Sequence, residues 1–112
     1  MKKNKLLVQI EKITQGNSSE TNKLIEILIR QTSEKLALLK SCDQESNWKE
    51  IKKIAHFLKS NFIALKMQRA IRLSEYLRRE AGDNIGETKN QLKELYVICT
   101  QIIEDLGRNV NV

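Results

Sequence analysis

The stretch Ile51-Lys52-Lys53-Ile54-Ala55-His56-Phe57-Leu58-Lys59-Ser60 predicts the central part of an amphipathic helix that runs roughly from Trp48 to Leu65. At about 100° per residue, one side of this helix is apolar and must face a core. That side consists of Ile51, Ile54, Ala55, Leu58, Phe62 and Leu65. His56, the single histidine of the chain, falls about 140° away from Ile51. We therefore expect the imidazole to face solvent within a ring of polar and apolar neighbours, Lys49, Lys52, Lys59, Ser60 and Ile63.

Apolar residues recur at helical spacing in four other segments. These segments are Lys5–Thr14, Glu20 to about Ser41, Gln68–Ala81, and Asn84 to about Leu106. Short connectors join the four longer helices, so helices that follow one another in sequence should pack as antiparallel neighbours. We predict an all-α fold, an up-down antiparallel four-helix bundle with a short N-terminal capping helix. The 112 residues should form a single domain, whose bundle core spans about residues 20–107.

Polar residues that favour helix starts precede three of these helices. Ser18 or Ser19 is expected to cap the second helix, since either follows a glycine break. Asn47 and Asn84 are each followed three residues later by glutamate, a spacing typical of a capping box. Trp48 should then pack near the start of the histidine helix.

Basic residues outnumber acidic residues by 20 to 14, which gives a formal net charge of +6. Such an excess favours an acidic protein face, phosphate or nucleic acid as a partner. Aromatic residues make up only 4% of the chain, which argues against base stacking on nucleic acid. The hypothesis of a nucleic-acid binder therefore rests on net charge alone. A basic surface that is simply solvated would explain the same charge.

Two cysteines, Cys42 and Cys99, lie far apart and form no Cys-x-x-Cys pattern. We expect buried free thiols in a reducing compartment rather than a disulfide. The N-terminus has a basic start but no apolar run long enough for a signal peptide. No stretch approaches the ~20 apolar residues of a membrane span. The expected location is the cytoplasm.

The chain offers few arrangements suited to catalysis. A single histidine excludes a histidine-based metal cluster, and neither a Gly-rich phosphate loop nor a Gly-x-Ser-x-Gly elbow is present. The scattered carboxylates on the helix surfaces are expected to be solvated charges; they include Glu20, Glu26, Glu75 and Glu80. We expect neither a hydrolase nor a metalloenzyme, and no metal or cofactor.

The neighbours of His56 suit the transient binding of a phosphoryl group. A neutral imidazole carries a free lone pair and can attack phosphorus without a dedicated base. Lys59 at i+3 and Lys52 at i−4 could neutralise the phosphorylated ring, and the small Ser60 leaves room for a partner's active site. Apolar residues available for docking are Phe57 and Ile63. A plain surface histidine would fit the same pattern, and the spacing alone does not decide between the two.

The stretch Ile54–Phe62, with Ala55-His56-Phe57-Leu58-Lys59-Ser60 at its centre, resembles the motif A-H-x-L-K-[G/S] of histidine-containing phosphotransfer (HPt) domains. The likeness extends over roughly residues 5–106. Leu6–Ile13 with Gly16-Asn17 resembles the short opening helix of the family and its turn. Gln44–Lys52, with Trp48, resembles the approach to the histidine helix, and Ala70, Leu73 and Leu77 match the apolar spacing of the next helix. Phe57 follows the histidine where the dimerising H-box of a sensor kinase has an acidic residue, so the resemblance is to the HPt family.

The resemblance implies a phosphorelay intermediate with no kinase activity of its own. His56 would accept a phosphoryl group from the aspartate of one receiver domain and pass it to the aspartate of another. Lys59 would stabilise the phosphoryl group, Ser60 would fill the small-residue position, and the receiver would supply an acidic pocket and Mg²⁺. The implied partners are response-regulator receiver domains or a hybrid sensor histidine kinase. We expect a monomer that binds neither nucleic acid nor a membrane.

Two positions depart from the family pattern. Lys66 stands where the family usually has glycine, so the turn after the histidine helix should either cost strain or differ. Arg78 stands opposite the histidine, where glutamine or glutamate is common, and could contact the phosphoryl group or repel a partner. With Lys52, Phe57 and Ile63, these two residues make up the predicted docking surface. The alternative hypothesis is an HPt-like helical adaptor that binds receiver or kinase domains without phosphotransfer.

Overall fold

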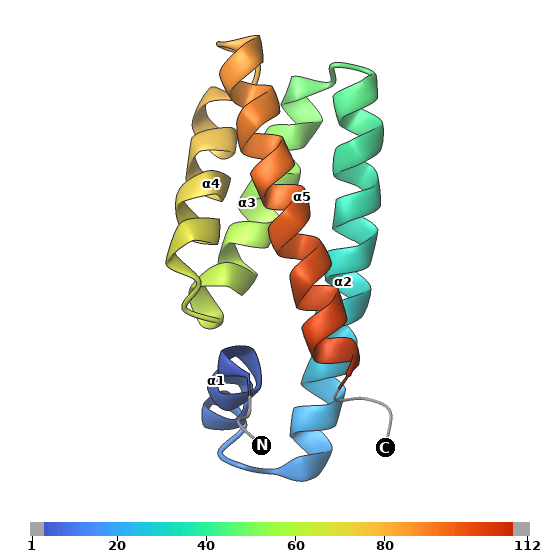
Figure 1. The fold of residues 1–112 in the computed structure, drawn as a ribbon, viewed down its shortest axis with the longest axis vertical. Coiled ribbons are helices and arrows are strands. Elements are labelled where there is room, and N and C mark those ends of the chain that lie inside the picture. The colour runs from blue at the N-terminus through green and yellow to red at the C-terminus, as the bar shows by residue number, and fades with distance from the viewer. Residues whose placement is uncertain (1–3, 109–112) are drawn as a thin grey trace.

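The computed structural model of the protein describes residues 4–108, which form helices and connecting turns (Figure 1). The helices are α1 (Lys5–Ile13), α2 (Ser18–Gln44), α3 (Trp48–Ala64), α4 (Gln68–Glu80) and α5 (Ile85–Gly107). No strand occurs within the described range, and the prediction of an all-α protein is confirmed. None of the helices in residues 4–108 combines the length and the apolar composition needed to cross a bilayer.

The four longer helices stand side by side, and each runs antiparallel to the next (Figure 1). α2 and α4 each contact both α3 and α5, and the α3–α4 contact is the most extensive. α1 lies across one end, where it packs against α2 and α5. Because α3 has α2 on one side and α4 on the other, its remaining side faces solvent.

The core is built from the apolar sides of all five described helices. The predicted apolar side of α3 is buried along its whole length, with no residue more than 5% exposed among Ile51, Ile54, Ala55, Leu58, Phe62 and Leu65. The other helices contribute Ile10, Ile25, Leu39, Leu77, Leu92, Leu95 and Leu106. With its inward side filled in this way, α3 has no room to turn about its axis, and residues between the apolar positions must point outward.

Both cysteines are buried and free, as the sequence predicted. Burial raises the pKa of the Cys99 thiol to about 12, and burial is also the main cause of the raised pKa of Cys42. A buried thiol that stays protonated behaves as a small apolar side chain. The two cysteines therefore belong to the core.

Asparagine side chains cap the starts of α2, α3 and α5. Asn47 and Asn84 each accept a hydrogen bond from the backbone amide three residues later, which confirms both predicted caps. At α2 the cap is Asn17, which uses the same spacing. The prediction of Ser18 or Ser19 was wrong, because both serines already lie within the helix and the amide oxygen of Asn17 reaches the first turn before them.

α2 also ends later than predicted, at Gln44 rather than near Ser41. Its last turn is fixed to α5, since the Asp43 carboxylate accepts hydrogen bonds from Tyr96 Oη at 3.0 Å and from Lys89 Nζ at 2.5 Å. These contacts between distant segments extend the helix into residues that the sequence pattern assigned to a polar connector.

The turn between α3 and α4 contains Lys66 in the left-handed conformation, with a φ angle of +56°. The Lys66 amide donates to the Ile63 carbonyl at 3.1 Å, and the Met67 amide donates to the Phe62 carbonyl at 3.0 Å. These are the two hydrogen bonds of a Schellman motif, which usually has glycine at the left-handed position. The turn therefore keeps the usual left-handed form, which lysine adopts at a cost that glycine would not have.

Gly82 allows the α4–α5 turn to pass close to the start of α3. It has a φ angle of +90°, and a Cβ atom at this position would lie 2.6 Å from Cγ of Trp48. The Gly82 amide donates to the buried Thr88 hydroxyl at 3.0 Å. Trp48 therefore packs near the start of the histidine helix, as predicted, and it does so against the turn that precedes α5.

Replacing Lys66 with glycine should raise the free energy of unfolding by about 1 kcal/mol, because glycine occupies the left-handed region without strain from a Cβ atom. Lys66→Ala removes the same side chain but keeps Cβ, and this matched control should not gain the same stability. Urea denaturation of the two variants and the parent chain makes the comparison. Equal stabilities for the glycine and alanine variants would contradict the assignment of strain to Lys66.

Candidate functional site

His56 lies at the middle of α3 on its solvent side, and its side chain is exposed, as predicted. It borders a surface hollow of about 350 Å³ that is lined by Lys52, Lys53, His56 and Arg78. The first three residues come from one side of α3, and Arg78 reaches the hollow from α4. The expected position of Arg78 opposite the histidine is thus observed, and three basic side chains lie around one imidazole.

A carboxylate of α4 connects the two helices beside this hollow. Glu75 Oε1 accepts hydrogen bonds from Lys59 Nζ at 2.8 Å and from Arg78 Nε at 2.8 Å. Glu75 Oε2 accepts a further bond of 2.7 Å from a terminal nitrogen of Arg78. We call Lys59, Glu75 and Arg78 the carboxylate bridge. It holds in place the lysine one turn from His56 and the arginine opposite it.

The two cations of the carboxylate bridge stabilise the ionised form of Glu75. Hydrogen bonds from Arg78, and then from Lys59, lower the pKa of the Glu75 carboxyl to about 2, and the Glu75 hydrogen bond raises the pKa of Arg78. All three side chains stay partly open to water, with 28% of Lys59, 30% of Glu75 and 38% of Arg78 exposed. A fixed cation pair that water can reach is also accessible to a second anion.

The basic excess of the whole protein is concentrated on the helical hairpin that carries His56. The segment Trp48–Glu80 holds nine of the 20 basic residues and three of the 14 acidic residues. Its formal charge of +6 equals that of the entire chain, so the rest of the chain has no net charge. The hairpin therefore carries a positive potential that would attract an acidic partner.

The predicted apolar docking residues are exposed, but one of them is partly covered. Ile63 is 53% exposed and Phe57 is 38% exposed. The ammonium group of Lys35, from α2, lies 4.4 Å from the centroid of the Phe57 ring. Nearby, the Asn61 side-chain amide donates to Gln31 at 3.2 Å and joins the same two helices. Phe57 thus belongs to a mixed α2–α3 surface.

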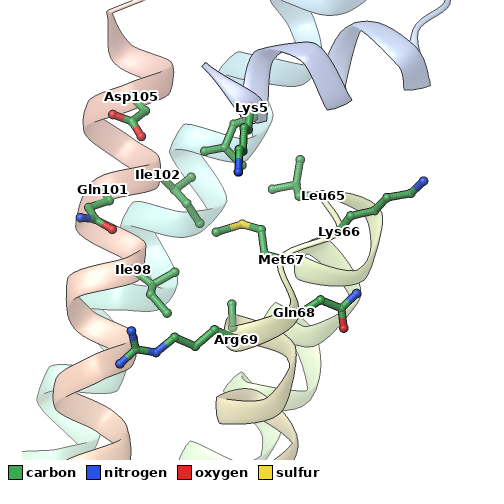
Figure 2. A pocket seen from close by; sticks show the side chains of 12 residues that line it. Lys5, Leu65, Lys66, Met67, Gln68, Arg69, Ile98, Gln101, Ile102 and Asp105 are labelled. Atoms are coloured by element: carbon green, nitrogen blue, oxygen red, sulfur yellow. The ribbon is translucent and has the colours of Figure 1, made fainter. Parts of the chain in front are cut away.

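Ser60 is exposed one turn after His56, and its side chain is small, so it leaves open the space beside the ring. Lys66 lies elsewhere. It lines a groove of about 420 Å³ between the α3–α4 turn, α1 and the second half of α5 (Figure 2). In this view the side chains of Met67 and Ile102 point into the groove. Ten residues from His56 along the chain, Lys66 does not line the histidine hollow.

The sequence did not single out three residues of this surface. Glu75 was expected to be a solvated charge, but it binds two of the cations next to His56. Its spacing of three residues from Arg78 could have indicated half of that bridge. Lys53, which lines the histidine hollow, stands three residues before His56 and could have been found in the same way. The contact of Lys35 with Phe57 depends on the α2–α3 register, for which the sequence carries no local signal.

Within residues 4–108, no group of three or more His, Cys, Asp or Glu side chains is placed to hold a metal ion. The side chains that line the hollow together with His56 are ammonium and guanidinium groups. Such a set binds anions rather than cations. The chemistry that the arrangement supports is therefore nucleophilic attack by an exposed imidazole on an electrophile that carries negative charge.

The lowered pKa of Glu75 predicts a pH dependence of stability. The folded carboxyl titrates near 2 and the unfolded one near 4.5, so its stabilising contribution is complete above about pH 5 and is lost as the pH falls toward 2. Glu75→Gln should therefore lower the free energy of unfolding at neutral pH and leave it almost unchanged at pH ~2.

The control for this measurement is Glu94→Gln, which removes the carboxylate of the more exposed Arg69–Glu94 pair. Urea denaturation at several pH values should show a smaller effect for this control. A Glu75→Gln variant whose stability runs parallel to that of the parent chain between pH 7 and about pH 2 would show that the bridge does not stabilise the fold.

Comparison with other proteins identified no relative of this chain. Neither family models, nor curated proteins, nor solved structures gave a match to the chain. Any assignment of function therefore rests on the motif residues and on the geometry around His56.

Proposed function

We propose that this protein is a phosphorelay intermediate of a two-component signalling system. His56 accepts a phosphoryl group from the aspartate of one receiver domain and passes it to the aspartate of another. The observation that carries the proposal is the exposed imidazole of His56, which shares a hollow with Lys52, Lys53 and Arg78 at the centre of a motif resembling that of HPt domains.

The transfer step needs only groups that the two partners bring. A lone pair of the imidazole attacks phosphorus of the aspartyl phosphate and forms an N–P bond. The P–O bond to the aspartate breaks, and its electron pair returns to the carboxylate. The second transfer reverses these roles, with the carboxylate of the next receiver as nucleophile. Mg²⁺ and the acidic pocket belong to the receiver, so the chain acts as a phosphocarrier without kinase activity of its own.

The residues around His56 have distinct roles in this proposal. Lys59 and Arg78 neutralise charge on the transferred phosphoryl group, while Lys52 adds to the positive potential that attracts the acidic receiver pocket. Ser60 leaves space for that pocket to reach the ring. Apolar contacts to the receiver come from Phe57 and Ile63, which are exposed on the same helix. Lys66 lines the groove beside α1 and not the histidine hollow, so in this proposal it contacts the receiver only at the edge of the docking surface.

The helical arrangement suits this role. We classify α2 to α5 as an up-down antiparallel four-helix bundle with α1 as a cap at one end. A rigid packed scaffold holds the nucleophile at an open surface hollow, where the active site of a larger partner can close over it. In this proposal the protein works as a monomer in the cytoplasm, and its partners are response-regulator receivers or a hybrid sensor histidine kinase.

A second hypothesis is a helical adaptor of the same architecture that binds receiver or kinase domains without phosphotransfer. The observation that favours it is the carboxylate bridge, since both Lys59 and Arg78 are already bound to Glu75. If these cations were not available to a phosphoryl group, docking would remain while transfer would fail.

Incubation with a receiver domain that carries radiolabelled aspartyl phosphate should transfer the label to this chain and not to its His56→Gln variant, because His56 is its single imidazole. Label retained on His56→Gln would rule out the site. Receivers that bind the parent chain and His56→Ala equally, with no exchange of label, would support the adaptor.

Replacing Lys59 with alanine should slow the transfer by about tenfold, the effect of losing ~1.4 kcal/mol of charge stabilisation in the transition state. Lys23→Ala is the matched control, since Lys23 is an exposed lysine of α2 outside the basic hairpin. Single-turnover transfer from the same labelled receiver measures both. Equal rates for the two variants would remove Lys59 from the transfer step.

A further inference from the structure

The carboxylate bridge places an anion of the protein on the cations that a phosphorylated His56 would need. Lys59 follows His56 by one helical turn, and Arg78 lines the hollow next to the imidazole. Both are bound by Glu75 at 2.7 to 2.8 Å. Before phosphorylation, therefore, the two cations are partly neutralised by a carboxylate that cannot diffuse away.

We propose that Glu75 is a positioning residue that competes with the phosphohistidine for Lys59 and Arg78, and that it thereby makes the phosphorylated state short-lived and favours onward transfer. This inference rests on the proposed function. It concerns a residue that makes no bond to the phosphoryl group and acts through the two cations that do.

Donor counts show how the competition would work. The bridge uses one of the three N–H donors of Lys59 and two of the five donors of Arg78. Both side chains can therefore turn toward a phosphoryl group while they keep part of their contact with Glu75. The shared cations then lie between two anions, and repulsion between the carboxylate and the phosphoryl oxygens destabilises the phosphorylated form relative to a chain with a neutral residue at position 75.

The partial exposure of the bridge makes this exchange feasible. About a third of each of the three side chains is open to water, so their rearrangement does not require the helices to separate. The same exposure limits the size of the effect, since water screens charges at the surface. A change of about fivefold in the stability of the phosphorylated state is the size expected for one partly screened charge.

The test uses a small phosphoryl donor, so that it does not depend on any partner. In phosphoramidate, the attack of the imidazole lone pair on phosphorus forms the N–P bond of phosphohistidine and breaks the P–N bond to ammonia, which leaves. The parent chain, Glu75→Gln, Glu75→Asp and Glu94→Gln are each phosphorylated in this way. The lifetime of the phosphohistidine and its ³¹P chemical shift are then recorded.

The lifetime should increase about fivefold in Glu75→Gln, with a change in ³¹P chemical shift, because the cations turn fully to the phosphoryl group. Glu75→Asp keeps the negative charge and should stay close to the parent chain. Glu94→Gln makes the same change in net charge at a distant ion pair, and should leave both readouts unchanged.

Two results would overturn the inference. One is a phosphorylated parent chain whose lifetime and chemical shift are the same in Glu75→Gln. The other is an equal increase in Glu75→Asp and Glu75→Gln, which would show that the charge is not the cause. Failure of His56 to accept a phosphoryl group in the parent chain or in any variant is a separate result, and it would count against the proposed function itself.

Discussion

The packing of α3 against α4 sets the register on which the candidate site depends. α4 buries the small side chains of Ala70 and Ser74, which permit a close approach of its backbone to neighbouring helices, and the Schellman turn at Lys66 fixes where α4 begins. In this register Glu75 lies within hydrogen-bond distance of Lys59, and Arg78 reaches the hollow beside His56. A slip of one residue would rotate these side chains by about 100° and separate them. The turn that contains Lys66 in its left-handed conformation keeps α3 and α4 in this register.

Much of the fold follows from the local sequence. The apolar side of α3 is so regular that it predicts both the buried face and the exposure of His56, and Asn47 and Asn84 predict two helix starts. The wrong cap of α2 was a local error, since Asn17 stands directly before the two serines, whereas the wrong end of α2 lies where distant contacts act. The last turn of α2 depends on Asp43, whose partners lie in α5 and have no counterpart in the local pattern. In the candidate site, the helical spacing predicts that Lys52 and Lys59 lie near His56. The contact of Glu75 with Lys59 depends on the α3–α4 register, which the local sequence does not predict.

The surface that carries His56 is positively charged, and Glu75 neutralises part of that charge. The hairpin Trp48–Glu80 carries a formal charge equal to that of the whole chain, and this charge would attract an acidic partner to the hairpin. The carboxylate bridge neutralises part of the charge at the point where a phosphoryl group would sit. A phosphocarrier must accept its cargo and release it, so strong binding of the phosphohistidine would oppose the second transfer. Partial neutralisation by Glu75 is consistent with a carrier that holds the group only briefly.

The presence of a single histidine allows a direct spectroscopic test of the proposed role. The protein can be labelled with ¹⁵N in histidine only, mixed with an aspartyl-phosphorylated receiver domain, and examined by ³¹P–¹⁵N correlation NMR. We expect a one-bond coupling between phosphorus and one imidazole nitrogen, and the signal should disappear when an unphosphorylated second receiver is added. An imidazole that remains uncoupled while the receiver keeps or hydrolyses its phosphate would contradict the role of His56 as a phosphoryl carrier.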